Sequence, residues 1–228
     1  VYDGTALTAG GKIEGIVDGE DVEFKVTGSQ TNKGTSKNTY SLKWNGSAIE
    51  TNYALASESI GDLKVTEQTI DPGEDPEKPN SNYDGVTVNN PSNEVYDGKE
   101  HKWSPTVADK EGNALVEGTD YEVAYSTEDF TNVTGTITVT ITGIGNYTGT
   151  VVRTYAITPA EVIATANNAN KVYGENDPEL KATVTGTLNN DTVDYTVTRD
   201  LGEDVGKYAI HVTGDEDQGN YHVTYTAG

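Results

Sequence analysis

Polar and apolar side chains alternate along several stretches of the chain. Within residues 40–46, Tyr40, Leu42 and Trp44 fall on one phase, and polar residues fall on the other. A period of two is the pattern of a β-strand that is buried on one face only. The same alternation recurs in residues 121–125, 137–143, 208–214 and 221–225. Helical periodicity is hardly detectable, so the sequence predicts an all-β chain.

The alternating stretches belong to an internal repeat. A Val-Tyr opening occurs at Val1-Tyr2, Val95-Tyr96 and Val172-Tyr173, and each opening is followed by an Asn-Tyr pair at 52–53, 146–147 and 220–221. The tyrosine of each opening precedes the asparagine of its pair by 50, 50 and 47 residues. Between these landmarks, residues 40–46, 137–143 and 208–214 align without gaps. A fixed internal period indicates tandem copies of one structural unit.

The repeats predict three small β domains in an elongated array. We expect domains at 1–70, 83–159 and 160–228, and an acidic, proline-rich linker at 71–82 that acts as a semi-rigid spacer. The connection between the second and third domains, around Pro159, is much shorter and contains a single proline. The first copy starts at its Val-Tyr opening and the third stops soon after its Asn-Tyr pair. We therefore expect a missing strand at each outer edge, as in a window from a longer array. Sandwich-like and β-grasp-like units both fit the pattern.

Charge and composition narrow the classes of function. The chain has 37 acidic and 15 basic residues, a net charge of −22, no cysteine and three histidines. Such a charge repels phosphate backbones and anionic lipids, so we expect no nucleic-acid partner. No apolar run is long enough for a membrane-spanning helix, so we expect no membrane insertion. Without cysteine there are no disulfides. The motifs of nucleotide-binding loops, hydrolase nucleophiles and zinc proteases are absent, which argues against an enzyme.

The repeats resemble a family of bacterial surface domains. The third copy, with Lys171 to Pro178 and Gly219-Asn220-Tyr221, is similar to the MBG (YGX-type) domains of large, mainly Gram-positive adhesins. The second copy resembles such tandem repeats through Val95 to Gly98, 117–121, 145–149 and 155–160, and the first copy departs more between its two motifs. The resemblance implies an extracellular, cell-wall-associated β-rich module that is adhesive or mucin-associated. It carries over no catalytic residues.

Two groups of residues are candidate sites. Trp103 has no counterpart on the inward face, and Trp103 with His101, Tyr125 and Phe130 forms a candidate ligand-binding patch. Asp215, Asp217 and Asn220 place clustered oxygen atoms beside a glycine, which is a candidate calcium site; the alternative is a solvated hairpin tip. No other cofactor is expected. For the Tyr-Asp-Gly openings, we expect a tight turn with the tyrosine packed over its own small core.

Two hypotheses for the function follow. In the first, the chain is a monomeric, non-catalytic stalk segment of a cell-surface adhesin that also contacts host mucin or glycans. In the second, it is a dedicated carbohydrate- or protein-binding module with its site in the second domain. Head-to-tail strand donation between molecules is a third alternative, because of the missing edge strands.

Overall fold

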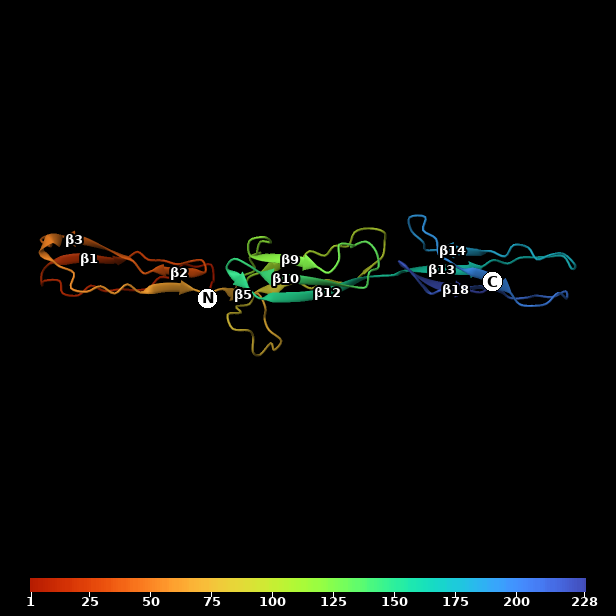
Figure 1. Ribbon diagram of the computed structural model, residues 1–228, viewed down its shortest axis with the longest axis horizontal. Helices are drawn as coiled ribbons and strands as arrows, with labels where there is room; N and C mark the ends of the chain where they lie inside the picture. Colours follow the sequence, from red (N-terminus) through yellow and green to blue (C-terminus); the bar gives the residue numbers. More distant parts are fainter. The chain divides into compact units, whose positions relative to one another are not determined.

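The computed structural model describes residues 1–228, and its only helical element is one 3-10 turn, η1 (Glu50–Asn52) (Figure 1). The all-β prediction is confirmed. No helix is long and apolar enough to span a membrane. Contacts divide the chain into two compact units: 1–89, 106–124 and 140–151 form the first, and 90–105, 125–139 and 152–228 form the second. The domain boundaries expected from the sequence stay a prediction, and the two units are described separately below.

The first unit contains four pairs of strands. An antiparallel pair joins β1 to β3, with Phe24 opposite Leu42. A second antiparallel pair joins β2 to β4, a third joins β6 to β8, and β5 runs parallel to β11. The bounds of these strands are β1 (Asp21–Val26), β2 (Gly34–Lys37), β3 (Tyr40–Asn45), β4 (Asp62–Val65), β5 (Gln68–Thr69), β6 (Thr87–Val88), β8 (Val107–Ala108) and β11 (Tyr147–Thr148).

The second unit is built around β13, which lies between antiparallel β14 and parallel β18 (Figure 1). Strand β17 pairs with the outer edge of β18, and β15 pairs with β16. A further sheet has the order β7-β12-β10-β9, and residues 121–124, 140–143 and 150–151 of its strands are counted with the first unit. The bounds are β7 (Glu94–Val95), β9 (Tyr121–Tyr125), β10 (Thr136–Gly143), β12 (Thr150–Thr158), β13 (Ala160–Ala166), β14 (Ala182–Thr185), β15 (Thr196–Arg199), β16 (Ile210–Thr213), β17 (Asp217–Gln218) and β18 (Tyr221–Thr226).

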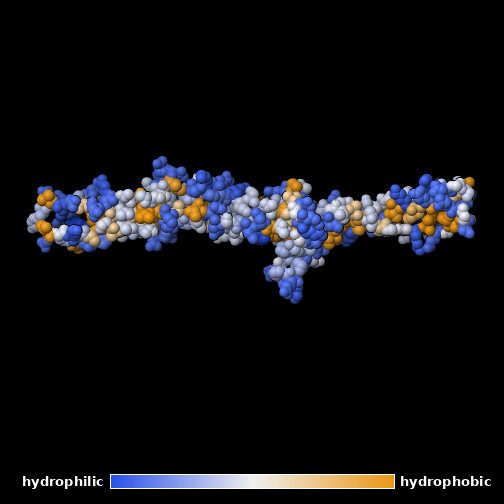
Figure 2. All heavy atoms as spheres, turned by 180° about the vertical axis from the view of Figure 1, so that it is seen from behind, coloured by the Kyte–Doolittle hydropathy of each residue, from blue (hydrophilic) through white to orange (hydrophobic).

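Burial follows the alternation of the strands. In β10, Ile137, Val139 and Ile141 are almost fully buried, and the threonines between them lie at or near the surface. Val162 and Ala164 of β13 pack in the same way with Val223 of β18. Hydrophilic side chains cover most of the face seen in Figure 2, and the apolar ones form separate small patches.

The acidic segment 71–82 starts and ends beside β5. The Thr69 N–H donates to the carbonyl oxygen of Asn82 (3.1 Å), and the Asn80 N–H donates to that of Pro72 (3.1 Å). The Asn80 side chain also donates to Asp71 Oδ2 (2.9 Å). These bonds close the segment into a loop, and both of its ends belong to the first unit.

Candidate functional site

The predicted aromatic patch comes together in the second unit. The Tyr125 hydroxyl donates to the Trp103 carbonyl oxygen (2.8 Å), and the Tyr125 ring meets Phe130 edge-on at 5.1 Å between centroids. The His101 N–H donates to the Phe130 carbonyl oxygen (2.7 Å). One main-chain bond, one hydroxyl bond and one ring contact thus join all four predicted residues into one cluster, in which Phe130 is buried and the other three are partly exposed.

Two further residues complete this cluster. The Lys102 ammonium lies over the rings of Tyr125 (4.7 Å) and Phe130 (5.2 Å), a cation–π arrangement. The Tyr155 hydroxyl donates to the His101 carbonyl oxygen (3.0 Å) and accepts from the Trp103 N–H (3.3 Å). Sequence reasoning missed Lys102 and Tyr155. The position of Lys102 beside Trp103 was a usable signal, whereas Tyr155 lies 52 residues away along the chain.

The hollow beside Trp103 is small. It has a volume of about 170 Å³ and is lined by Ser92, Glu94, His101, Lys102, Trp103 and Tyr155. Pockets for drug-sized ligands are about 300–1,000 Å³, so this hollow can receive only part of a ligand. A partly exposed indole beside a cation is suited to stacking on a flat surface such as a sugar ring. The cluster is therefore a contact patch rather than an enclosing site.

The Tyr-Asp-Gly turn next to this patch is stabilised by hydrogen bonds to the Asp97 carboxylate. Asp97 Oδ1 accepts from the Lys99 N–H (2.9 Å) and lies 2.7 Å from His101 Nε2. These bonds, with a further one from the Lys99 side chain, lower the pKa of Asp97 to about 2. Gly98 follows at φ +76°, where a side chain would be strained. The predicted tight turn is present here.

The tyrosine of this motif does not pack as the sequence analysis expected. In the second unit, Tyr96 meets Tyr221 of the third Asn-Tyr pair edge-on, with centroids 5.5 Å apart and planes at 89°. In the first unit, Tyr2 meets Tyr147 of the second Asn-Tyr pair in the same way, at 5.5 Å and 80°. The opening tyrosines Tyr2 and Tyr96 thus contact the Asn-Tyr pair of the next copy rather than their own core. We call these two contacts the tyrosine junctions.

The asparagine of each pair completes its tyrosine junction. Asn146 Oδ1 accepts from the Lys33 N–H (2.8 Å), and its side-chain amide donates to Asn32 (3.1 Å). In the second unit, Asn220 Oδ1 accepts from the Val133 N–H (2.8 Å), and its amide donates to Asn132 (2.9 Å). Both asparagines therefore bind a Thr-Asn loop of the preceding copy, at 31–32 and 131–132.

Main-chain bonds repeat at the two junctions as well. The Tyr2 N–H donates to Thr66 (2.7 Å), and the Tyr96 N–H donates to Thr158 (2.8 Å). Two residues beyond each threonine, the Gln68 N–H donates to Asn146 (3.0 Å) and the Ala160 N–H donates to Asn220 (2.9 Å). The two junctions therefore share side-chain and main-chain contacts at matching positions.

The ring of Tyr221 is anchored by its hydroxyl. The hydroxyl donates to Asp191 Oδ2 (2.7 Å) and accepts from the Leu188 N–H (3.0 Å). Burial and the bond to Asp191 raise the pKa of Tyr221 to about 12. Tyr147 is similarly buried, which raises its pKa to about 12. Both hydroxyls therefore stay protonated across the physiological pH range.

Two of the three candidate calcium side chains, those of Asp217 and Asn220, are directed to different partners. The Asn220 side chain is directed to the loop at Val133, and Asp217 Oδ1 lies 2.7 Å from His222 Nδ1. Asp215 offers its carbonyl oxygen to the Tyr225 hydroxyl (2.8 Å) and to Gln218 (2.8 Å). No group of three or more His, Cys, Asp or Glu side chains is placed to hold a metal ion.

Comparison with known families identifies one region of the chain. Residues 162–228 match the family described as MBG domain (YGX type). MBG domains occur in bacterial surface proteins and are non-catalytic modules. No curated protein and no solved structure matches the chain.

Proposed function

We propose that the chain is a non-catalytic repeat segment of a bacterial cell-surface adhesin, in which it acts as a stalk that holds successive β domains in fixed mutual orientation. The observation that carries this proposal is the repetition of the tyrosine junction, with the same rings, asparagine and main-chain bonds at two places. The MBG match of residues 162–228 supports a location at the bacterial surface, and the cell wall of a Gram-positive bacterium is the finer part of this proposal.

The connections at the junctions suit a stalk. Only Thr66 and Glu67 separate β4 from β5, and only Pro159 separates β12 from β13. A tensile force on the chain is therefore transmitted from strand to strand through connections of one or two residues, with no flexible linker between them. The net charge of −22 adds repulsion between neighbouring molecules, which favours a monomeric stalk.

Backbone ¹⁵N relaxation of the full chain tests this stalk. We expect the two sides of the second junction within the second unit, 125–139 with 152–158 on one side and 160–228 on the other, to tumble with one correlation time. Replacing Tyr96 and Asn220 together by alanine should release the joint and give two shorter correlation times. Replacing Tyr195, an exposed tyrosine of the same unit, by alanine is the matched control and should leave the single value. Independent tumbling of the unchanged chain would refute a fixed joint.

The aromatic cluster supports a second candidate function, contact with host mucin or glycans. It combines a partly exposed indole, two further rings and a cation on one patch, which suits stacking on a sugar ring. We expect Trp103→Ala to abolish saturable binding of the full chain to immobilised mucin, and Tyr195→Ala to leave binding unchanged. Equal binding by the Trp103 variant and the parent would remove this patch as the site.

A further inference from the structure

Lys102 and Trp103 both line the small hollow of about 170 Å³ in the aromatic cluster of the second unit. The Lys102 ammonium lies over the rings of Tyr125 (4.7 Å) and Phe130 (5.2 Å). This cation–π contact restricts a side chain that would otherwise be mobile, so less conformational entropy is lost when the ammonium binds a ligand. The second unit thus presents a positive charge and a partly exposed indole at one place.

No carboxylate of the chain neutralises this ammonium. Lys102 Nζ has no ion-pair partner, although acidic side chains occur on both sides of the hollow in sequence. Those carboxylates are held by other donors: Asp97 Oδ1 lies 2.7 Å from His101 Nε2, and Glu94 Oε1 accepts from the Ser92 hydroxyl (3.1 Å). The charge of Lys102 is therefore available to a ligand that reaches the hollow.

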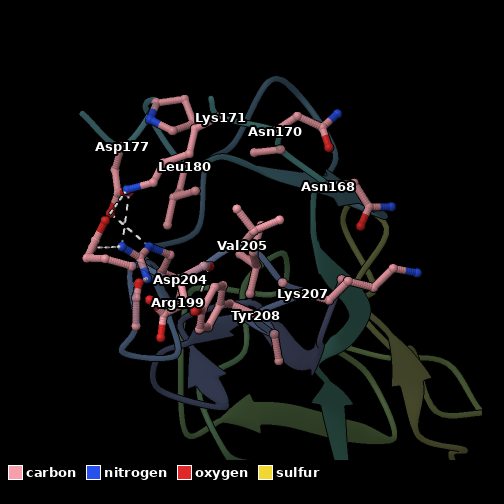
Figure 3. A pocket seen from close by; sticks show the side chains of 18 of the residues that line it. Asn168, Asn170, Lys171, Asp177, Leu180, Arg199, Asp204, Val205, Lys207 and Tyr208 are labelled. Carbon is pink, nitrogen blue, oxygen red and sulfur yellow. Dashed lines mark hydrogen bonds and ion pairs between the residues drawn. The ribbon is translucent and has the colours of Figure 1, made fainter. Parts of the chain in front are cut away.

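Two other cations of the second unit have the opposite role. At a larger cavity, of about 620 Å³, Lys171 pairs with Asp177 (2.7 Å) and Glu203 (2.6 Å). Arg199 pairs with the same two carboxylates, at 2.8 Å and 2.6 Å, so that the four side chains form one network (Figure 3). Both positive charges are neutralised within the fold, whereas the charge of Lys102 is not.

The combination of lysine and tryptophan is specific to the second copy. The positions can be compared by counting from the three Val-Tyr openings without gaps. Lys102 and Trp103 then correspond to Thr8 and Ala9 in the first copy and to Glu179 and Leu180 in the third. A side chain that the repeated fold required would recur, whereas here the charge is absent in one copy and reversed in the other. The repeat itself therefore does not explain why Lys102 and Trp103 stand together.

The net charge of −22 does not prevent an anion from binding at this hollow. Interactions between exposed charges decay over about 8 Å at physiological ionic strength, so only groups close to the bound anion count. Among these groups, Asp97 is compensated by its bonds to Lys99 and His101, and Lys102 is uncompensated. The local charge complementarity is therefore with an anionic ligand.

We propose that the hollow beside Trp103 binds an acidic sugar, that is, a pyranose that carries a carboxylate or a sulfate group. The sugar ring stacks on the indole, the anionic group pairs with the Lys102 ammonium, and a sugar hydroxyl donates to the Glu94 carboxylate. The small volume of the hollow restricts this contact to one ring of a longer glycan. This inference rests on the proposed contact with glycans and names the class of sugar that the contact selects.

Titration of the full chain with three related sugars tests the proposal. The probes are lactose, sialyllactose and sulfated lactose, which share a neutral disaccharide and differ in the anionic group. The readout is the indole ¹H–¹⁵N signal of Trp103, which is distinguished from that of Trp44, the other tryptophan, in the first unit. We expect dissociation constants about fivefold lower for the two acidic sugars than for lactose, the effect of one exposed ion pair. This preference should disappear in about 1 M salt.

A charge-removing variant assigns the preference to one side chain. Lys102→Met keeps an unbranched side chain over the two rings and removes the ammonium, so the acidic sugars should bind about fivefold more weakly, with the dissociation constant of lactose. Lys207→Met removes an exposed lysine of the same unit that has no ion-pair partner, and this matched control should keep the preference. The salt dependence of the unchanged chain is a second readout that needs no variant.

The outcomes separate this inference from the function on which it rests. Equal affinity for all three sugars would overturn the selection of acidic sugars and leave the glycan contact in place, as would a preference that survives in the Lys102→Met variant. An unchanged Trp103 signal with every sugar would overturn both the selection and the contact. Binding of only one acidic sugar would support the inference and assign the anionic group as a carboxylate or a sulfate.

Discussion

Replacing the same motif tyrosine at two places tests the energetic role of the tyrosine junction. Tyr96 is 6% exposed and packs edge-on against Tyr221, which is 4% exposed, whereas Tyr173 is 71% exposed. Truncation of a buried aromatic residue to alanine costs about 3–5 kcal/mol, of which about 0.5–1.5 kcal/mol comes from an aromatic pair. We expect Tyr96→Ala to lower the free energy of unfolding by about 3 kcal/mol. An exposed substitution such as Tyr173→Ala should change it by less than about 0.5 kcal/mol.

The assay is urea unfolding followed by Trp103 fluorescence in a Trp44→Phe background, because Trp103 lies in the same unit as Tyr96. A double-mutant cycle with Tyr221→Ala should give a coupling free energy of about 0.5–1.5 kcal/mol. If Tyr96→Ala and Tyr173→Ala destabilise the chain equally, the junction contributes nothing beyond ordinary surface packing and the reasoning fails.

Three further predictions concern hydrogen bonds and charge. Asn220→Ala removes a half-buried acceptor and donor of the junction, and should cost about 1–2 kcal/mol in the same urea assay. Arg199 and Lys171 lower the pKa of Asp177 to about 2. The stabilising effect of the Asp177 carboxylate should therefore be complete above about pH 4 and disappear as the pH falls through 2. In carboxyl ¹³C titrations, Arg199→Gln should move the pKa of Asp177 back toward 3.8. Asp217 raises the pKa of His222 above 6.5. This pair therefore stabilises the fold below pH 6.5 and loses its effect as the pH rises through the raised pKa. Asp217→Asn should lower the pKa of His222, as measured by imidazole ¹H titration.

Alternation predicted the strands well where one face is buried and the other solvated. Residues 137–143 and 221–225 lie within β10 and β18, and their buried phases agree with the pattern. The aromatic cluster could also be predicted, because Tyr125 and Phe130 are close in sequence and Trp103 lies only 22 residues before Tyr125. These features are local, and local patterning determines them.

The tyrosine junctions could not be predicted in this way. Tyr2 and Tyr147 are far apart in sequence, and nothing near either residue indicates the other. Each motif taken alone fits an ordinary turn with a core tyrosine, which is how the sequence analysis interpreted it. The usable signal was in the alignment of the copies, where the spacing between opening and Asn-Tyr pair is maintained although the segments between them differ.

Sparse burial in the first copy explains why these junctions matter. Among residues 1–62, Ala48 is the only buried hydrophobic residue, and the apolar side chains of β1 and β3 are only half-buried. A segment with so little core depends on its neighbour, since in repeat arrays the stability is approximately the sum of weak unit terms and interface terms. The junction contacts supply such an interface term, through two rings and an asparagine at each joint. On this argument the loss of one junction weakens both sequence copies that meet there, which an isolated buried tyrosine could not do.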